Sequence, residues 1–202
     1  ERYGTLAGYA EDVIDVCKTL CLEQVVFIGH SVSGMVGLLA AKKEPSLFSK
    51  LVFIGPSPRY INDEDYYGGM EESDLKDLLQ VMDNNYLGWS RSLAPAIVAN
   101  EDRPELGESL AESFCTTNPE IAKKFARVIF YADNRADLKS LNIPSLTLQA
   151  KNDVLTSERV ARYIQEHTQG NELILLDSSG HCPHLSDPET VAQAIKTFLQ
   201  SS

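Results

Sequence analysis

The chain has 202 residues, 43% of them hydrophobic, which is enough for one sizeable buried core in a folded globular domain. Its net charge is −11 at pH 7 and its basic residues never run longer than a pair, so nothing offers a phosphate-neutralising surface. No apolar run approaches the roughly 20 residues of a membrane span, and the N-terminal stretch lacks the basic start and apolar core of a signal peptide. We therefore expect a cytoplasmic protein that binds neither nucleic acid nor membrane.

The four cysteines are too few for a disulfide framework. Cys17 and Cys21 fall on one apolar face of a predicted helix, which favours reduced, buried thiols. A zinc site is not favoured, because no matching pair of His or Cys residues follows them. We expect neither a metal nor a cofactor.

Strands and helices alternate along both ends of the chain. Stretches with apolar residues at three- and four-residue spacing predict helices at 6–20, 35–43, 157–167 and 188–199, with Thr5 as the candidate cap of the first. Short apolar runs bounded by Gly or Pro predict strands at 24–29, 50–58, 143–150 and 171–180. Nearly continuous apolar strands that alternate with helices indicate an α/β fold, with a parallel sheet covered on both faces.

The interval from residue 59 to residue 142 contains no convincing strand. Helical spacing is found instead at 74–99, 105–115 and 119–138. An all-helical insertion between two strands of a parallel sheet is a candidate lid over the carboxyl ends of the strands, where such sheets bind ligands. The alternative is a helical subdomain that only packs. We therefore divide the chain into a core of residues 1–58 and 144–202 and a lid of residues 59–143.

Ser31 stands between a predicted strand and a predicted helix, in the sequence "GHSVSG". A serine hydroxyl becomes a good nucleophile when an imidazole takes its proton and a carboxylate holds that imidazole. A sharp strand-to-helix turn presents such a serine and needs small residues two positions before and after it, which are Gly29 and Ser33 here. The helix that follows would point its N-terminus, with the Val32 N–H, at a developing oxyanion.

The base must be one of four histidines. His181 follows the fourth strand on a Gly-containing loop, at the carboxyl end where catalytic residues of parallel sheets gather, and is the best candidate. His184 is second, with a structural role favoured. His30 adjoins Ser31, so its side chain should point away from the hydroxyl and line a pocket wall or pack, and His167 ends a helix.

The acid is expected to be Asp153, which follows the third strand at a carboxyl end. Asp177 and Asp187 lie near His181 in the sequence and could serve only through a different loop geometry. The chain order Ser31, Asp153, His181 is the order of the triad in α/β-hydrolases.

Four separated segments carry a family resemblance: "GHSVSGMVG", "GPSPRYINDEDYYGG", "NYLGW" and "GHCPHLSDPE". They resemble the bacterial activator of the sigma-B phosphatase and its plant relatives, the strigolactone and karrikin receptors. The resemblance implies an α/β-hydrolase fold, a triad of Ser31, Asp153 and His181, a four-helix lid and a pocket for a small apolar ligand. It also suggests, with packing as the alternative, that five lid residues face this pocket: Trp89, Leu93, Ala126, Ile129 and Phe130.

The resemblance further implies several strands before the nucleophile strand, one of them followed by a loop that donates a second oxyanion N–H. Only 24 residues precede Val25, and they predict one helix. We expect the chain to be the C-terminal part, about three quarters, of a longer protein, or one of two assembling pieces. Alone it would expose an apolar strand edge at "QVVFI" and would turn over poorly without the second donor.

The sequence thus predicts a serine hydrolase that opens a small apolar ester or lactone through an acyl-enzyme. By the resemblance, it would act in stress signalling as a sigma-B phosphatase activator, with a PAS-containing phosphatase as partner. The alternative is a small-molecule receptor in which hydrolysis is slow or vestigial. A third reading is a catalytically inactive α/β scaffold.

Overall fold

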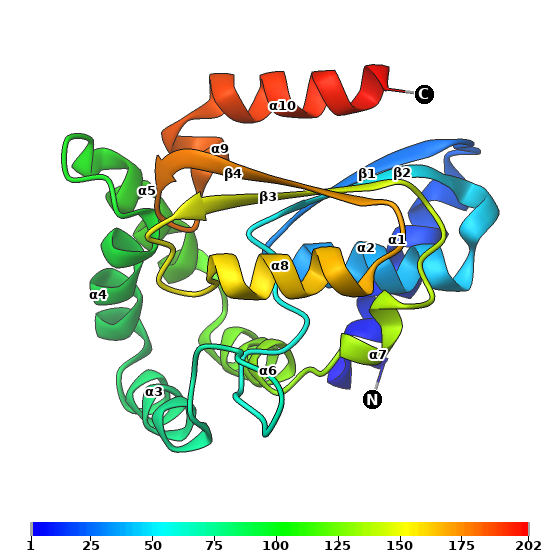
Figure 1. Cartoon of the computed structure of the whole chain (residues 1–202). Helices are drawn as coiled ribbons and strands as arrows, with labels where there is room; N and C mark the ends of the chain where they lie inside the picture. The colour runs from blue at the N-terminus through cyan, green and yellow to red at the C-terminus, as the bar shows by residue number, and fades with distance from the viewer. Residues whose placement is uncertain (1, 202) are drawn as a thin grey trace.

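A computed structural model describes residues 2–201, so Glu1 and Ser202, the two ends of the predicted core, lie outside the described residues (Figure 1). All four predicted strands are confirmed, and they pair in parallel in the order β1-β2-β3-β4. Their bounds are Val25–His30 for β1, Phe48–Ile54 for β2, Ser145–Lys151 for β3 and Asn171–Ser179 for β4.

Helices cover both faces of this sheet. On one face lie α1 (Leu6–Thr19), α2 (Val32–Lys43) and α8 (Glu158–His167), and on the other lies α10 (Pro188–Gln200). Short helical turns complete the core at Arg2–Gly4, Pro45–Leu47 and, as α9, Pro183–Ser186. The predicted start of the second helix at Met35 is three residues late, because the turn is confined to Ser31 and helical geometry begins at once after it. Thr5 does precede α1, but its side chain makes no capping hydrogen bond.

The central strands are buried on both faces, as a covered parallel sheet requires. Leu51 and Phe53 of β2 belong to the apolar cluster under α1, α2 and α8, whereas Val52 and Ile54 belong to the cluster under α10. This alternation follows the two-residue period of a strand, and it explains why the sequence of β2 reads as a continuous apolar run.

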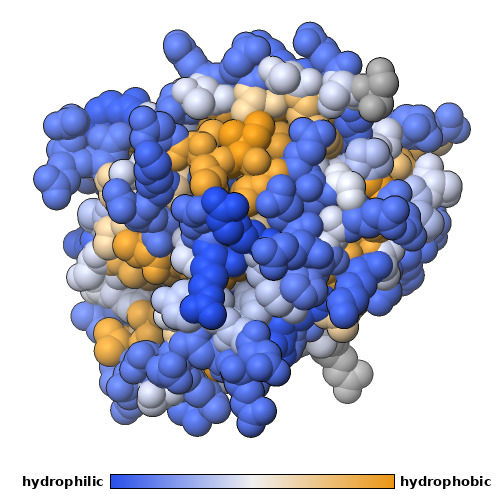
Figure 2. Space-filling view, in the orientation of Figure 1, coloured by the Kyte–Doolittle hydropathy of each residue, from blue (hydrophilic) through white to orange (hydrophobic). Residues whose placement is uncertain are grey.

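Strand β1 is much less covered. It pairs with β2 alone among residues 2–201, and the strands that α10 mainly covers are β3 and β4. Val26 and Ile28 are therefore 37% and 48% exposed, in agreement with the apolar edge expected from "QVVFI". At the other edge Leu175 of β4 is 39% exposed, and Figure 2 shows an apolar area below α10 on an otherwise mostly hydrophilic face.

The chain between β2 and β3 is helical, as predicted. It forms α3 (Glu72–Asn84), α4 (Tyr86–Val98), α5 (Pro104–Thr116), α6 (Pro119–Phe130) and the short α7 (Arg135–Leu138). Figure 1 shows α4 and α5 beside the carboxyl ends of β3 and β4. These helices have an apolar cluster of their own, which includes Leu75, Leu79, Met82, Tyr86 and Phe130.

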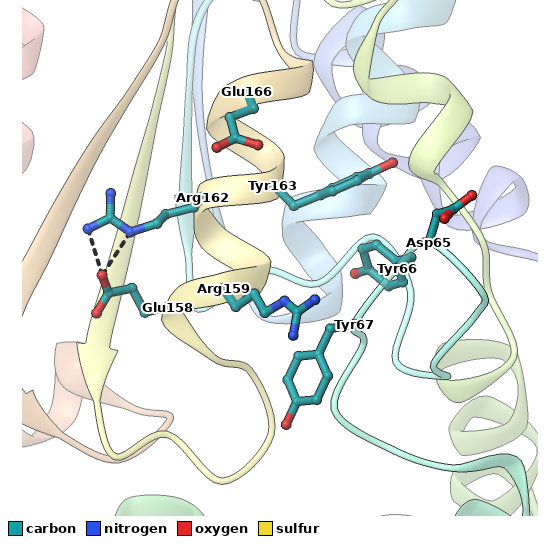
Figure 3. A pocket seen from close by; sticks show the side chains of 8 residues that line it. All are labelled: Asp65, Tyr66, Tyr67, Glu158, Arg159, Arg162, Tyr163 and Glu166. Atoms are coloured by element: carbon teal, nitrogen blue, oxygen red, sulfur yellow. Dashed lines mark hydrogen bonds and ion pairs between the residues drawn. The ribbon is translucent and has the colours of Figure 1, made fainter.

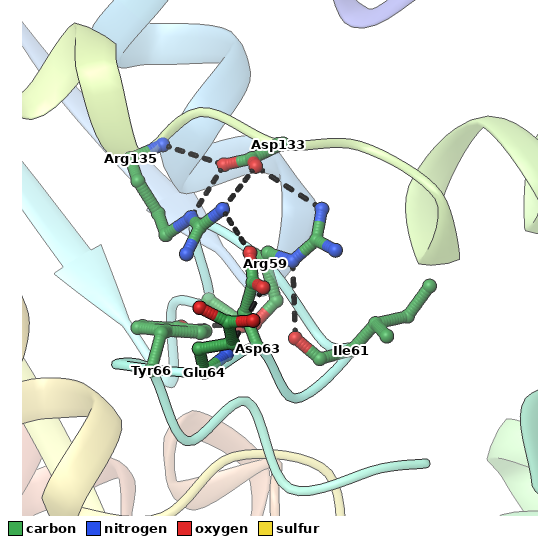
Figure 4. A network of polar contacts seen from close by, with 8 residues as sticks. Arg59, Ile61, Asp63, Glu64, Tyr66, Asp133 and Arg135 are labelled. Atoms are coloured by element: carbon green, nitrogen blue, oxygen red, sulfur yellow. Dashed lines mark hydrogen bonds and ion pairs between the residues drawn. The ribbon is translucent and has the colours of Figure 1, made fainter. Parts of the chain in front are cut away.

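A network of ion pairs joins the two places where the chain enters and leaves this helical segment (Figure 4). The Asp133 carboxylate lies 3.1 Å from Arg59 and 2.7 Å from Arg135, and Arg135 also reaches Asp63 at 2.9 Å. The Arg135 guanidinium stacks over the ring of Tyr66 at 5.0 Å. The entry loop and the exit segment are thereby held against each other.

The entry loop also packs on the core helix α8, around a surface hollow of about 500 Å³ (Figure 3). The Arg159 guanidinium lies 4.8 Å from the centre of the Tyr67 ring. The rings of Tyr66 and Tyr163 meet edge to face at 4.8 Å. The loop that leads into the helical segment is thus held by aromatic contacts on one side and by ion pairs on the other.

No helix within residues 2–201 is both long and apolar enough to cross a membrane. The four cysteines are free thiols, with Cys17 and Cys182 buried and Cys115 partly buried. The prediction that Cys21 is buried is wrong: α1 ends at Thr19, and Cys21 is exposed in the turn that follows.

Candidate active site

Ser31 occupies the sharp turn between β1 and α2. Its backbone is in a region that residues other than glycine rarely adopt, with φ 55° and ψ −127°. The Ser31 N–H donates to the carbonyl of Ile54 at 2.8 Å, and the Gly34 N–H donates to the carbonyl of Ser31 at 3.0 Å. These bonds tie the turn to β2 and to the first turn of α2, so they support its strained backbone.

Gly29 is the residue that the tight turn demands. A Cβ at this position would lie 2.6 Å from the backbone carbonyl of Ser33 and from the amide nitrogen of Gly34. No side chain fits there without moving the backbone of α2. The close approach of the α2 backbone therefore explains why a glycine stands two positions before Ser31.

His181 and Asp153 lie together at the carboxyl ends of β4 and β3. The Nδ1 atom of His181 is 2.8 Å from Oδ2 of Asp153, and their side chains are 3% and 1% exposed. A carboxylate accepts only, so Nδ1 carries the proton, and in the neutral ring Nε2 is left with a lone pair. This Nε2 is buried and has no hydrogen-bond partner among the described residues. The ring thus presents an unused base.

The Asp153 carboxylate is well supplied with donors. Oδ2 also accepts from the hydroxyl of Thr156 at 2.8 Å and from the side-chain amide of Gln149 at 3.2 Å, and Oδ1 accepts from the backbone N–H groups of Leu155 and Thr156. Burial, the largest single influence, raises the pKa of Asp153, but the hydrogen bond and charge of His181 and these donors outweigh it, so the pKa is lowered. The group is a carboxylate at neutral pH.

Ser31, Val32 and His181 line one cavity of about 530 Å³. The five lid residues suggested by the resemblance line this cavity too: Trp89, Leu93, Ala126, Ile129 and Phe130. Val32 is the first residue of α2, where a backbone N–H has no partner inside the helix. Most of the remaining wall is apolar or aromatic, with Met82, Tyr86, Ile97, Leu110, Phe114, Phe125 and Leu155.

Tyr60 is a cavity residue that the sequence reasoning missed. It is 2% exposed and lines the cavity, and its ring packs edge to face on Phe130 at 5.1 Å. Burial raises the pKa of its hydroxyl to about 12, and the nearby Ser31 side chain opposes that rise. The phenol is therefore neutral and can donate beside Ser31. Its position shortly after β2, at a carboxyl end, is a signal that could have found it.

The other candidate bases and acids have different surroundings. His30 lines the cavity wall, and the ring of His184 packs against His30 in a tilted arrangement, with centroids 4.4 Å apart. His167 Nδ1 donates to the carbonyl of Tyr163 at the end of α8. On the acid side, Asp177 pairs with Lys151 in solvent, and Asp187 caps α10 through the N–H of Thr190.

Among residues 2–201, no group of three or more His, Cys, Asp or Glu side chains is arranged to hold a metal ion. What the site does contain is a serine on a strained turn and a histidine that both line the cavity, and a buried carboxylate behind that histidine, in the chain order Ser31, Asp153, His181. The model of the alpha/beta hydrolase family matches residues 2–194. The chain belongs to this family.

Related proteins agree with this membership. The chain is 35% identical over 199 residues to a strigolactone esterase of Arabidopsis thaliana, a match that covers 98% of this α/β-hydrolase and 74% of that protein. It is 35% identical over 192 residues to a karrikin insensitive 2 receptor of Petunia hybrida, covering 95% and 71%. A solved hydrolase from Oleispira antarctica superposes with a TM-score of 0.94 at 37% identity, covering 99% and 74%. The predicted fold and the resemblance to the plant receptors are confirmed.

Proposed function

We propose that this α/β-hydrolase is a serine hydrolase of a small apolar ester or lactone, with Ser31 as nucleophile, His181 as base and Asp153 as the acid that orients the base. The observation that carries the proposal is the unpartnered Nε2 of His181, in the same cavity as Ser31, on a ring whose other nitrogen is bound to Asp153. A buried nitrogen lone pair without a donor is costly unless substrate or nucleophile uses it.

The reaction follows from these positions. His181 Nε2 takes the proton of the Ser31 hydroxyl as its oxygen bonds to the substrate carbonyl, and the oxyanion that forms accepts from the Val32 N–H. His181 then gives the proton to the departing alkoxide, which leaves as an alcohol, and an ester on Ser31 remains. Water, deprotonated by His181, attacks this ester, and the acid is released as the Ser31 hydroxyl is restored. Asp153 stabilises the His181 imidazolium in both steps.

The apolar wall favours a substrate with little charge. Helices α3, α4, α5 and α6 all contribute to this wall, and we propose that residues 59–143 act as a lid over residues 1–58 and 144–202. The names of the relatives, an esterase and a receptor of small molecules, support the same substrate class. A cytoplasmic location and a PAS-containing phosphatase as partner stay predictions from the sequence.

The proposal is tested with a fluorophosphonate probe and 4-nitrophenyl acetate. We expect one adduct on Ser31, located by mass spectrometry, and a burst of nitrophenolate that equals the amount of protein. Ser31→Ala should abolish both. Labelling elsewhere, or turnover that survives Ser31→Ala, would contradict the proposal.

A second candidate function is a receptor in which the same cavity binds a ligand and hydrolysis is slow. The observation that favours it is that the helical segment supplies much of the cavity wall. A bound molecule would therefore contact these helices as well as Ser31. In Ser31→Ala, a butenolide ligand should then raise the melting temperature and slow amide exchange in α3–α6. Protection confined to the core, or no binding, would exclude this function.

A further inference from the structure

His30 joins the turn that carries Ser31 to the loop that carries His181. It is the last residue of β1, directly before Ser31, and its Nε2 atom lies 2.7 Å from the backbone carbonyl oxygen of His181. A carbonyl only accepts, so Nε2 of His30 carries a proton and donates it. The two residues are 151 positions apart in the chain, so this bond is a long-range connection.

The backbone of His181 is held from two sides. Its N–H donates to the carbonyl of Ile97 in α4 at 2.7 Å, and its carbonyl accepts from His30. The first bond ties the loop to the helical segment, and the second ties it to the core. The His30 ring also contacts the rings of His181 and His184 in tilted arrangements, with centroids 4.8 Å and 4.4 Å away.

The charge state of His30 suits this role. Burial, and after it the neighbouring His181, lowers the pKa of His30 to about 4, so the ring is neutral at working pH. A neutral neighbour does not oppose the positive charge that His181 would gain when it accepts a proton. The neutral ring still keeps the Nε2–H that the bond requires.

We propose that His30 is a positioning residue, which holds the base His181 at the correct distance from Ser31 through its hydrogen bond to the His181 carbonyl. The inference rests on the proposed function of Ser31 and His181. Because His30 is covalently next to Ser31, one short bond fixes the backbone of the base relative to the nucleophile. Neither Asp153, which sets the tautomer and the ring orientation, nor Ile97, on the helical segment, supplies that link.

The matched variants are His30→Gln and His30→Met, which have side chains of similar length and volume. Gln can donate to the His181 carbonyl and Met cannot. A misplacement of about 1 Å near reacting groups costs on the order of 100-fold in rate. We expect kcat for 4-nitrophenyl acetate to fall about 10- to 100-fold in His30→Met. In His30→Gln, which keeps a donor for the His181 carbonyl, kcat should fall much less. KM should stay nearly constant, because Met and Gln fill about the same part of the cavity wall as His30 does. His184→Phe, which keeps an aromatic ring against His30, should behave as wild type.

A second readout does not depend on turnover. The proton between His181 Nδ1 and Asp153 gives a downfield proton NMR signal, which should broaden or shift in His30→Met and recover in His30→Gln. If wild-type protein shows neither labelling nor turnover, the proposed function fails, and this signal alone decides the role of His30. Equal kcat values and equal NMR signals in the Met and Gln variants would overturn the proposal. If His30→Met does not fold, His30→Leu takes its place in the same comparison.

Discussion

His181 Nδ1 and Asp153 Oδ2 lie 2.8 Å apart, with both side chains almost completely excluded from solvent. The distance is that of a charge-assisted hydrogen bond, and the carboxylate has four further donors that make its ionised form affordable in the interior. These four donors bind the Asp153 carboxylate and hold it in place. The pair therefore acts as one rigid unit.

Asp153→Asn changes the tautomer of His181 and keeps the shape of the side chain at position 153. The amide keeps the shape of the carboxylate but can donate to Nδ1, which would place the His181 proton on Nε2 and remove the base. We expect kcat for an activated ester to fall about 10,000-fold, as in a serine protease with the same change. Asp177→Asn, at an exposed ion pair with Lys151, is the control and should leave kcat unchanged. A loss below tenfold in Asp153→Asn would show that Asp153 does not orient the base.

Gly29→Ala tests the tightness of the turn. The added methyl group would meet the backbone of Ser33 and Gly34 at 2.6 Å, so the start of α2 must move. We expect the free energy of unfolding to fall by about 1–3 kcal/mol, and the fluorophosphonate to label Ser31 more slowly. Gly4→Ala, where a Cβ has no atom within 4 Å, should change neither quantity. Urea unfolding and labelling kinetics measure both, and equal stability of the two variants would contradict the steric argument.

The strands were predictable because strands of a parallel sheet that is covered on both faces have nearly continuous apolar sequences. Ser31, Asp153 and His181 could be selected because each follows one of these runs, and the carboxyl ends of parallel strands meet at one edge. What remained open was which of the carboxylates and histidines near that edge touch. That depends on the path of short loops, and the contact of His181 with Asp153 rather than Asp177 appears only in three dimensions.

Tyr60 and His30 show the limit more clearly. Tyr60 lies in a loop with no regular periodicity, so its position shortly after the end of β2 was the one signal that pointed to the site. His30 was expected to line the wall, which it does. Its bond to a backbone carbonyl 151 residues away could not be predicted, because every residue at that position would offer the same carbonyl. The prediction that Cys21 is buried was wrong for a local reason, because the helical spacing of apolar residues continues in the sequence past Thr19, where α1 ends.

The ion-pair network at Asp133 should stabilise the junction of the helical segment with the core. Asp133→Asn removes the partner of Arg59 and one of the two partners of Arg135. Since these side chains are roughly a fifth to a third exposed, solvent screening reduces the expected loss to about 1–2 kcal/mol in the free energy of unfolding. The loss should shrink in 1 M NaCl.

The comparison of salts also identifies the origin of the effect. Asp177→Asn, at an ion pair whose Asp side chain is 93% exposed, should cause no measurable change at either ionic strength. The loss in Gly29→Ala is steric, so it should be the same at both. Urea unfolding at 0.05 M and 1 M NaCl measures all three variants. A loss in Asp133→Asn that does not depend on salt would show that packing, and not charge, holds the junction.

Two partly buried histidines, His30 and His184, should make the fold sensitive to mild acid. Burial first, and His181 second, lowers the pKa of His30 to about 4, and the pKa of His184 is lowered by the same two causes. Near its ordinary pKa of about 6.5 His30 takes up a proton in the unfolded chain but not in the folded one. Its contribution is therefore complete above about pH 6.5 and is lost as the pH falls towards 4, by on the order of 3 kcal/mol.

This window lies mostly above the range in which carboxylates titrate, so it can be measured separately. Urea unfolding at pH 7.5, 6, 5 and 4.5 should show a steadily lower free energy of unfolding for the wild type. His30→Gln, which has no titrating ring, should give a shallower slope whatever its stability at pH 7.5. Asp153 attracts a proton to His30 and partly opposes the shift, so Asp153→Asn should steepen the slope slightly. Parallel slopes for wild type and His30→Gln would mean that His30 is protonated as easily in the folded protein as in the unfolded chain.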